Sequence, residues 1–281
     1  MRKSSRTAIG VAGLRAAHQL VDAEPRILDD PVILRLVGIE TLDTIREDRD
    51  RYQNPGALAL RSHVVLRSRY AEDRLAQAVA RGVTQYVILG AGFDTFAYRQ
   101  PAWARNLRIV EMDRAPMQRE KRDRLSLAQV FIPDNVIFGS IDLESEQLGE
   151  SLRKCGLGLS QPTFFSWLGV TMYLTEKAVF DVLRDVAHFP RGSEIVFTFA
   201  ALPTGDGVTD EALKRFAEMA ASVGEPWRTY FDADELGSRV RELGFSNVEL
   251  LEPSEAARRY FVNRKDALPP PGRRSIISMV V

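Results

Sequence analysis

The chain has 281 residues, of which 45% are hydrophobic and 27% are charged, enough apolar material for one large α/β domain. Its 38 Lys and Arg residues balance its 38 Asp and Glu residues, which disfavours a protein that coats nucleic acid or an anionic membrane. There is one cysteine and no secretory signal or membrane-spanning apolar stretch, so we expect a soluble, cytoplasmic protein without an intrachain disulfide.

The first 82 residues are predicted to be helical. The run Asp29-Asp30-Pro31 ends one helical segment, because proline disfavours helix at the residue before it. The turn Asn54-Pro55-Gly56 precedes a long helix over residues 57–81, which carries apolar residues at helical spacing and ends at Gly82. We expect these helices to form a cap over the ligand-binding edge of the rest of the chain.

From residue 83 the pattern changes to short apolar strands that alternate with helices. Strands are predicted at residues 86–89, 107–112, 135–139, 163–168 and 194–199, and a helix at 175–188. Alternation at this spacing predicts an α/β fold of the Rossmann-like kind, a mostly parallel sheet with helices on both faces.

The C-terminal part differs from this alternation. A helix at residues 233–243 stops at Gly244, and strands are predicted at 247–251 and 275–281. Two strands after five strand–helix units predict an antiparallel hairpin at one edge of the sheet. The irregular segment at 252–274, which contains Pro269-Pro270-Pro271, is expected to join the N-terminal helices in the cap.

Ligands of an open α/β sheet bind beyond the carboxyl ends of its strands. Gly90 and Gly92 follow the first predicted strand, where the missing side chains let a ligand approach the backbone closely. Asp113 ends the second strand and can accept hydrogen bonds from a ribose diol. Asp142 follows the third strand and can accept from an adenine amino group, with Leu143 as an apolar wall.

A nicotinamide dehydrogenase is the competing interpretation of this loop. Its fingerprint G-x-G-x-x-G requires a third glycine, which lets a helix pack closely and seats the pyrophosphate. Here Thr95 stands in that position, and Asp94 places negative charge where a pyrophosphate would lie. A cofactor with a sulfonium and an ammonium group tolerates that carboxylate, so the loop favours S-adenosylmethionine over NAD.

Several motifs give the chain a family resemblance. They span nearly the whole length and comprise Asp29-Asp30-Pro31, Arg67-Ser68-Arg69-Tyr70, the run from Leu89 to Thr95, Glu111-Met112-Asp113, the run from Trp167 to Leu174, and Gly224-Glu225-Pro226-Trp227. On these residues the chain resembles the leucine carboxyl methyltransferase family, and more closely its bacterial branch of S-adenosylmethionine-dependent methyltransferases. The resemblance implies a single methyltransferase domain over residues 1–281, with a helical cap at 1–82 and a Rossmann-like core at 83–281 that has an inserted segment near 252–274.

The resemblance also implies roles for individual residues. Arg69 should hold the cofactor carboxylate, with Arg15 as a second candidate for the same pocket. Other residues are candidate contacts to the rest of the cofactor, either because the family has a contact there or because they neighbour one in the loop. They are Gly90, Ala91, Gly92, Asp94, Asp113, Asp142, Leu143 and Trp167. One departure is Leu168, which stands where the eukaryotic-type enzymes have a glutamate that contacts the cofactor.

The expected partner is a small-molecule methyl acceptor. A carboxylate acceptor is favoured because, with a pKa of about 4, it is already ionised and needs no general base. A phenol or another hydroxyl is the alternative, and a cofactor-binding protein without activity is a third possibility. Tyr173, Arg228 and Tyr260 are candidate acceptor contacts. The three histidines lack metal-ligand spacing, so no metal is expected, and the sequence leaves the oligomeric state open.

Overall fold

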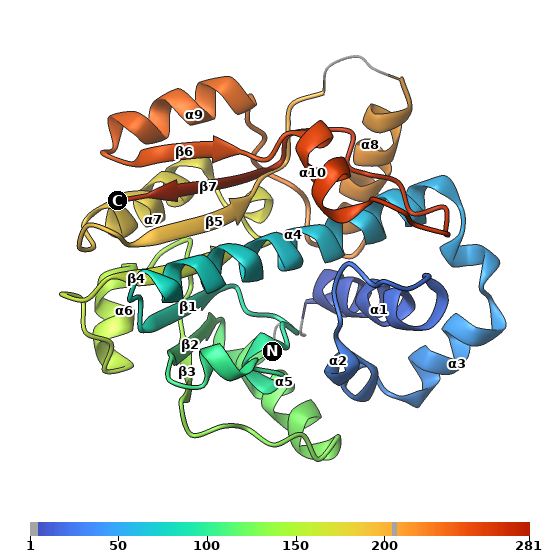
Figure 1. The fold of residues 1–281 in the computed structure, drawn as a ribbon, viewed down its shortest axis with the longest axis horizontal. Coiled ribbons are helices and arrows are strands. Elements are labelled where there is room, and N and C mark those ends of the chain that lie inside the picture. Colours follow the sequence, from blue (N-terminus) through green and yellow to red (C-terminus); the bar gives the residue numbers. More distant parts are fainter. Residues whose placement is uncertain (1–4, 204–206) are drawn as a thin grey trace.

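Seven strands form one sheet in the order β3-β2-β1-β4-β5-β7-β6 in the computed structural model, which describes residues 5–203 and 207–281 (Figure 1). The strands are β1 (Gln85–Leu89), β2 (Arg108–Asp113), β3 (Val136–Ser140), β4 (Thr163–Trp167), β5 (Glu194–Thr198), β6 (Ser246–Leu250) and β7 (Ile276–Val280). All seven lie within two residues of their predicted positions. The mostly parallel sheet and its antiparallel C-terminal pair are confirmed.

The last strand enters the sheet between two earlier strands. β7 pairs antiparallel with β5 on one side and with β6 on the other. Of the two strands of the predicted hairpin, β6 is therefore the edge strand of the sheet, and β7 lies between β6 and β5. Strands β1, β4 and β5 are buried along their whole length, as is typical of parallel strands that are covered by helices on both faces. The order of strands reverses between β1 and β4, and ligands bind at such a switch point.

Successive side chains along each strand point to opposite faces of the sheet and pack into two separate apolar clusters. In β1, Val87 and Leu89 face the cluster formed with the helices α6 (Leu148–Lys154), α7 (Glu176–Ala187) and α9 (Ala233–Glu242). Tyr86 and Ile88 face the opposite cluster, which includes residues of α4 (Pro55–Ala80) and α10 (Pro253–Tyr260). This period of two fixes which strand residues face each helical layer.

The N-terminal helices α1 (Arg6–Val21), α2 (Pro31–Leu36) and α3 (Ile39–Glu47) lie together beside the sheet (Figure 1). They share an apolar cluster with Phe93 of the glycine loop and with Met117 of α5 (Ala115–Leu127). The remaining helix is α8 (Gly207–Ser222), and short 3-10 turns occur at Asp50–Tyr52, Phe96–Tyr98, Ala102–Ala104 and Thr171–Tyr173. No helix in the described ranges is long and apolar enough to span a bilayer.

The segment predicted as irregular at residues 252–274 contains one helix, α10, which begins with Pro253 at its first turn. Proline is favoured at that position because the first N–H groups of a helix have no intrahelical partner. Downstream, Leu268 packs with Leu28 and Val65, and the carbonyl oxygen of Pro269 accepts a hydrogen bond from Ser62 of α4. These contacts tie the segment to α4 and to the N-terminal region.

Candidate cofactor and acceptor pocket

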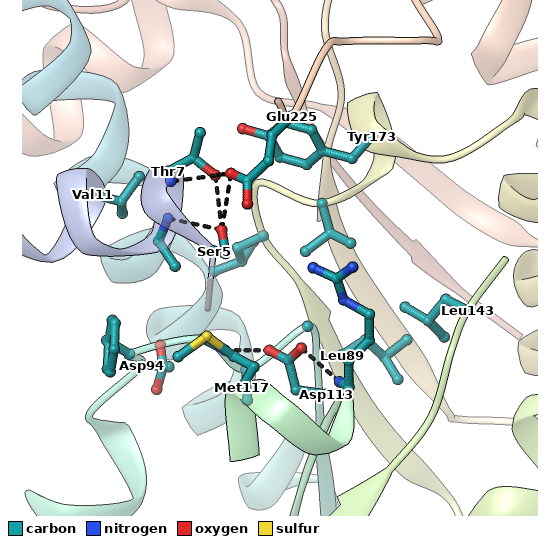
Figure 2. Close-up of a pocket in the computed structure, with 18 of the residues that line it drawn as sticks. Ser5, Thr7, Val11, Leu89, Asp94, Asp113, Met117, Leu143, Tyr173 and Glu225 are labelled. Atoms are coloured by element: carbon teal, nitrogen blue, oxygen red, sulfur yellow. Dashed lines mark hydrogen bonds between the residues drawn. The ribbon is translucent and has the colours of Figure 1, made fainter. Parts of the chain in front are cut away.

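A pocket of about 780 Å³ opens at the carboxyl ends of β1 to β4. Its volume falls in the range of sites for cofactors and small ligands. Figure 2 shows Asp94, Asp113 and Met117 on one side of it and Glu225 and Tyr173 on the opposite side. The predicted site residues that line it are Gly90, Ala91, Gly92, Asp94, Asp113, Asp142, Leu143, Tyr173 and Arg228.

The glycine loop is held close to Asp113. Gly90 has a φ of +63°, and a Cβ there would lie 2.4 Å from Cγ2 of Val170, so a larger residue would collide with the loop after β4. The N–H groups of Gly92 and Arg114 each donate to a different oxygen of the Asp113 carboxylate at 2.7 Å. Burial raises the pKa of Asp113 despite these donors. Each oxygen retains a lone pair that can accept a ligand hydroxyl.

Asp94 lies in a network of buried charges. Arg15 of α1 lies 3.8 Å from its carboxylate, pairs with Asp30 at 2.6 Å and donates to the Thr95 hydroxyl at 2.8 Å. Burial raises the pKa of Asp94, but the charge of Arg15, other cations and the Phe96 N–H outweigh burial and lower that pKa overall. Asp94 is therefore an anion at neutral pH. Arg15 is already paired, which makes it a weak candidate for the cofactor carboxylate.

A buried ion pair lies behind the loop. Lys121 of α5 contacts Glu111 of β2 at 2.7 Å, and the Tyr98 hydroxyl donates to the same carboxylate oxygen at 2.8 Å. Both charged side chains are at most 1% exposed. The pair joins α5 to β2 two residues before Asp113, so it helps to fix the strand end that carries this aspartate.

The expectation for Arg69 is corrected by the structure. Arg69 is half-exposed, pairs with Asp73 at 2.9 Å and does not line the pocket. Arg67 lines it instead, because two positions along a helix turn a side chain by about 200°. The guanidinium of Arg67 lies against Gly169, where a Cβ would be 2.5 Å from Nη1.

In the described part of the chain Arg67 makes no hydrogen bond or ion pair, although its charge interacts with Asp94 at longer range. Burial lowers its pKa to about 10, which still leaves the guanidinium protonated at neutral pH. A partly buried cation without an ion pair is stabilised when an anion accompanies it. Arg67 is therefore a candidate to bind an anionic group of a ligand, as are Arg6 and Arg114, which line the pocket as well.

The opposite end of the pocket is formed by the loop after β3. Asp142 accepts a hydrogen bond from the Glu144 N–H at 3.1 Å through one carboxylate oxygen, and Leu143 adds an apolar wall. Glu144 in turn pairs with Arg228 at 3.1 Å across the mouth of the pocket. Arg228 is thus anchored by this pair at the mouth.

Two further candidates lie outside the pocket. Trp167 is fully buried and packs against Phe197 in the core, so its place in the family motif reflects packing of β4. The hydroxyl of Tyr260 donates to Asp73 at 2.9 Å, on α4 away from the ligand edge. Residues 252–274 contribute no lining residue, so the expectation that this segment caps the ligand edge is not met.

Sequence reasoning missed the loop that closes the pocket instead. Val223, Gly224, Glu225 and Pro226 line it beside Ser5 and Thr7 of the N-terminal region. The motif Gly224-Glu225-Pro226-Trp227 was a usable signal, but nothing in its spacing indicates a partner more than 200 residues earlier. Among residues 5–203 and 207–281, no group of three or more His, Cys, Asp or Glu side chains could hold a metal ion.

Comparison with known proteins identifies relatives of the whole chain. The sequence model of the leucine carboxyl methyltransferase family matches residues 8–187. A Bacillus subtilis protein named "Putative S-adenosyl-L-methionine-dependent methyltransferase YktD" is 31% identical, and the match covers 95% of each chain. A protein of Frankia alni with the same description is 29% identical over 82% of this chain and 79% of its own length.

Solved structures match the fold. A DUF574 family protein from Streptomyces avermitilis has a TM-score of 0.57 at 18% identity, over 99% of this chain and 97% of its own. A "putative methyltransferase" from Thermobifida fusca has a TM-score of 0.55 at 17% identity, over 99% and 94% of the two chains. At these identities the structures show the fold alone. With the family match over 8–187 and the relative above 30% identity, the chain belongs to the leucine carboxyl methyltransferase family and is a methyltransferase.

Proposed function

We propose that this chain transfers the methyl group of S-adenosylmethionine to a carboxylate of a small molecule. The names of its relatives describe them as S-adenosylmethionine-dependent, and the pocket fits that cofactor. The observation that carries the fit is Arg67, a cation at the pocket with no partner in the described chain, which suits the methionine carboxylate. Asp94, held ionised, suits the ammonium group.

The rest of the cofactor has matching surroundings. Asp113 presents two oxygens, each already oriented by a backbone N–H, toward the place where a ribose diol would lie. Leu143, Met117 and Ile141 offer apolar contacts to an adenine ring, with Asp142 beside them. Leu168 lines the pocket as well, so the polar contact that the eukaryotic-type glutamate makes is absent at this position.

Bound S-adenosylmethionine supplies a methyl group activated by an adjacent sulfonium. The task of this chain is then to hold the acceptor close to that methyl group and in line with the bond that breaks, which can lower the barrier by several kcal/mol. We propose that Tyr173 and Arg228 line the acceptor end and that residues 1–82 act as the cap of a single domain.

The composition of the lining favours a carboxylate acceptor. None of the described residues that line the pocket is a histidine, the side chain whose ordinary pKa of about 6.5 suits it best to accept a proton near neutral pH. A carboxylate needs no such base because its pKa of about 4 leaves it ionised at pH 7. A phenol, with a pKa of about 10, would have to lose a proton during the reaction.

A panel of acceptors with a radiolabelled methyl donor tests this proposal. We expect labelled products from carboxylic acids, and mild alkali should release the label as methanol because the product is a methyl ester. Tyr173→Phe should keep kcat within about threefold, since no general base is required. Alkali-stable products from phenols, together with loss of turnover in Tyr173→Phe, would show that the acceptor is a hydroxyl.

A further inference from the structure

The first turn of α1 forms part of the pocket wall and is held in place by one distant side chain. Ser5, Thr7 and Ala8 line the pocket from the start of α1, and Glu225 lines it from the loop after α8. Oε2 of Glu225 accepts hydrogen bonds from the Ser5 hydroxyl and from the Thr7 N–H, each at 3.1 Å, and from the Thr7 hydroxyl. Figure 2 shows this cluster across the pocket from Asp113.

These bonds satisfy donors that a helix cannot satisfy by itself. The first four N–H groups of a helix have no intrahelical partner. In α1 the Ser5 hydroxyl accepts from the Ala8 N–H at 3.1 Å, and Glu225 accepts from the Thr7 N–H. A carboxylate is also favourable near the positive end of the helix dipole. Glu225 therefore acts as an N-cap supplied from 218 residues further along the chain.

The cap has consequences for the ligand site because α1 carries more than its first turn to the pocket. Val11, Ala12 and Arg15 also line it, and Arg15 is the residue that faces Asp94. The pocket wall is thus continuous from Glu225 through α1 to the glycine loop. A ligand in this pocket would lie against α1 and the Glu225 loop, with Glu144 and Arg228 at another part of the wall.

We infer that Glu225 is a positioning residue for methyl transfer: by capping α1 it closes the N-terminal helix over the bound cofactor and slows its release. The inference rests on the proposed binding of S-adenosylmethionine in this pocket. The hydrogen bonds of Glu225 run to Ser5 and Thr7 at the start of α1, so it acts on the cofactor through α1 in addition to its own place in the pocket wall. Cofactor exchange past α1 then requires the bonds from Ser5 and Thr7 to break.

Hydrogen exchange and ligand release test this role with S-adenosylhomocysteine as the probe. In the wild-type chain the ligand should slow amide exchange in residues 6–9. Glu225→Ala should speed exchange there without ligand and raise the ligand dissociation rate about tenfold, or about 1.4 kcal/mol, within the range for loss of a helix cap. Glu225→Gln keeps an acceptor without the charge and should give an intermediate rate.

Two controls make the result specific. Glu242→Ala makes the same chemical change at an exposed residue at the end of α9 and should leave both readouts at wild-type values. Thr7→Val should raise the dissociation rate in the wild-type background and add little in Glu225→Ala, because the two side chains share one interaction.

The outcomes separate this inference from the proposed function. If the wild-type chain binds the ligand but Glu225→Ala exchanges its α1 amides and releases the ligand at wild-type rates, the positioning role is overturned. If the wild-type chain does not bind the ligand at all while Glu225→Ala still speeds exchange in residues 6–9, the proposed function fails and the cap stands as a purely structural contact.

Discussion

Arg67 and Arg69 are two arginines on one helix, yet the structure gives them opposite surroundings. Arg67 faces the pocket without a partner in the described chain, and Arg69 pairs with Asp73 at the surface. Hydrogen bonds to charged groups contribute about 1.5–3 kcal/mol. We therefore expect Arg67→Gln to weaken binding of S-adenosylmethionine by about 10- to 100-fold in a calorimetric titration.

The neighbouring Arg69→Gln is the matched control for that titration. It removes the same charge from a half-exposed side chain, whose surface ion pair contributes about 0–1 kcal/mol at most. Its affinity should stay within about twofold of the wild-type value, since its guanidinium lies away from the ligand. Equal losses in the two variants would contradict the assignment of the cofactor carboxylate to Arg67.

His63, one helical turn before Arg67, makes stability depend on pH. Burial and then the charge of Arg67 lower the pKa of His63 to about 3, whereas an unfolded histidine has a pKa of about 6.5. Between these values the unfolded chain binds a proton that the folded chain does not. The contribution of His63 to stability is therefore complete above about pH 6.5 and is lost as the pH falls toward 3.

Urea unfolding at pH 7 and at pH 5 measures this dependence. We expect His63 to account for a loss of up to about 2 kcal/mol in the free energy of unfolding between these pH values. His63→Asn should remove that part of the loss, because asparagine does not titrate. His188→Asn, at an exposed residue, should lose as much stability as the wild-type chain over the same interval.

At the scale of elements, one buried ion pair fixes α1 against α4. Arg61 of α4 donates to both oxygens of Asp22, the residue that ends α1, at 2.7 and 2.8 Å. His18 contacts the same carboxylate at 2.7 Å, and both charged side chains are at most 2% exposed. Since α1 forms one wall of the pocket, this pair helps to set the position of that wall.

Breaking this pair should therefore be costly. Asp22→Asn leaves the buried guanidinium of Arg61 without a counter-charge, and removal of one partner of a buried pair costs about 3–5 kcal/mol. Asp43→Asn breaks an exposed pair with Arg46 and should cost at most about 1 kcal/mol. The midpoint of urea unfolding at pH 7 compares the two variants. Similar midpoints would mean that the Asp22 pair does not stabilise the fold.

Helices and strands could be predicted from the sequence where a hydrophobic pattern marks their position and length. Buried strands such as β1 and β4 are short apolar runs bounded by turn residues, and each was placed to within two residues. The sequence does not predict α10 because this helix has only 8 residues and a proline-rich segment follows it. The family resemblance points to Arg69, but only the packing of α4 on the sheet decides that Arg67 faces the pocket and Arg69 does not.

At the scale of the whole molecule, the sequence predicts the strand-end residues far better than the contacts between distant segments. Gly90, Asp113 and Asp142 follow successive parallel strands, and topology alone brings them to one edge of the sheet. The cap that Glu225 places on α1 joins residues 218 positions apart, and no local pattern encodes such a pairing. The same is true of the placement of β7 between β5 and β6.

A crystal structure of the chain with S-adenosylhomocysteine tests the central claim most directly. We expect the ligand carboxylate at hydrogen-bond distance from the Arg67 guanidinium, the ribose hydroxyls on Asp113, and the adenine ring against Leu143. We also expect the bond between Glu225 and Thr7 to be retained over the bound ligand. A ligand whose carboxylate lies away from Arg67, or whose ribose does not contact Asp113, would contradict the account.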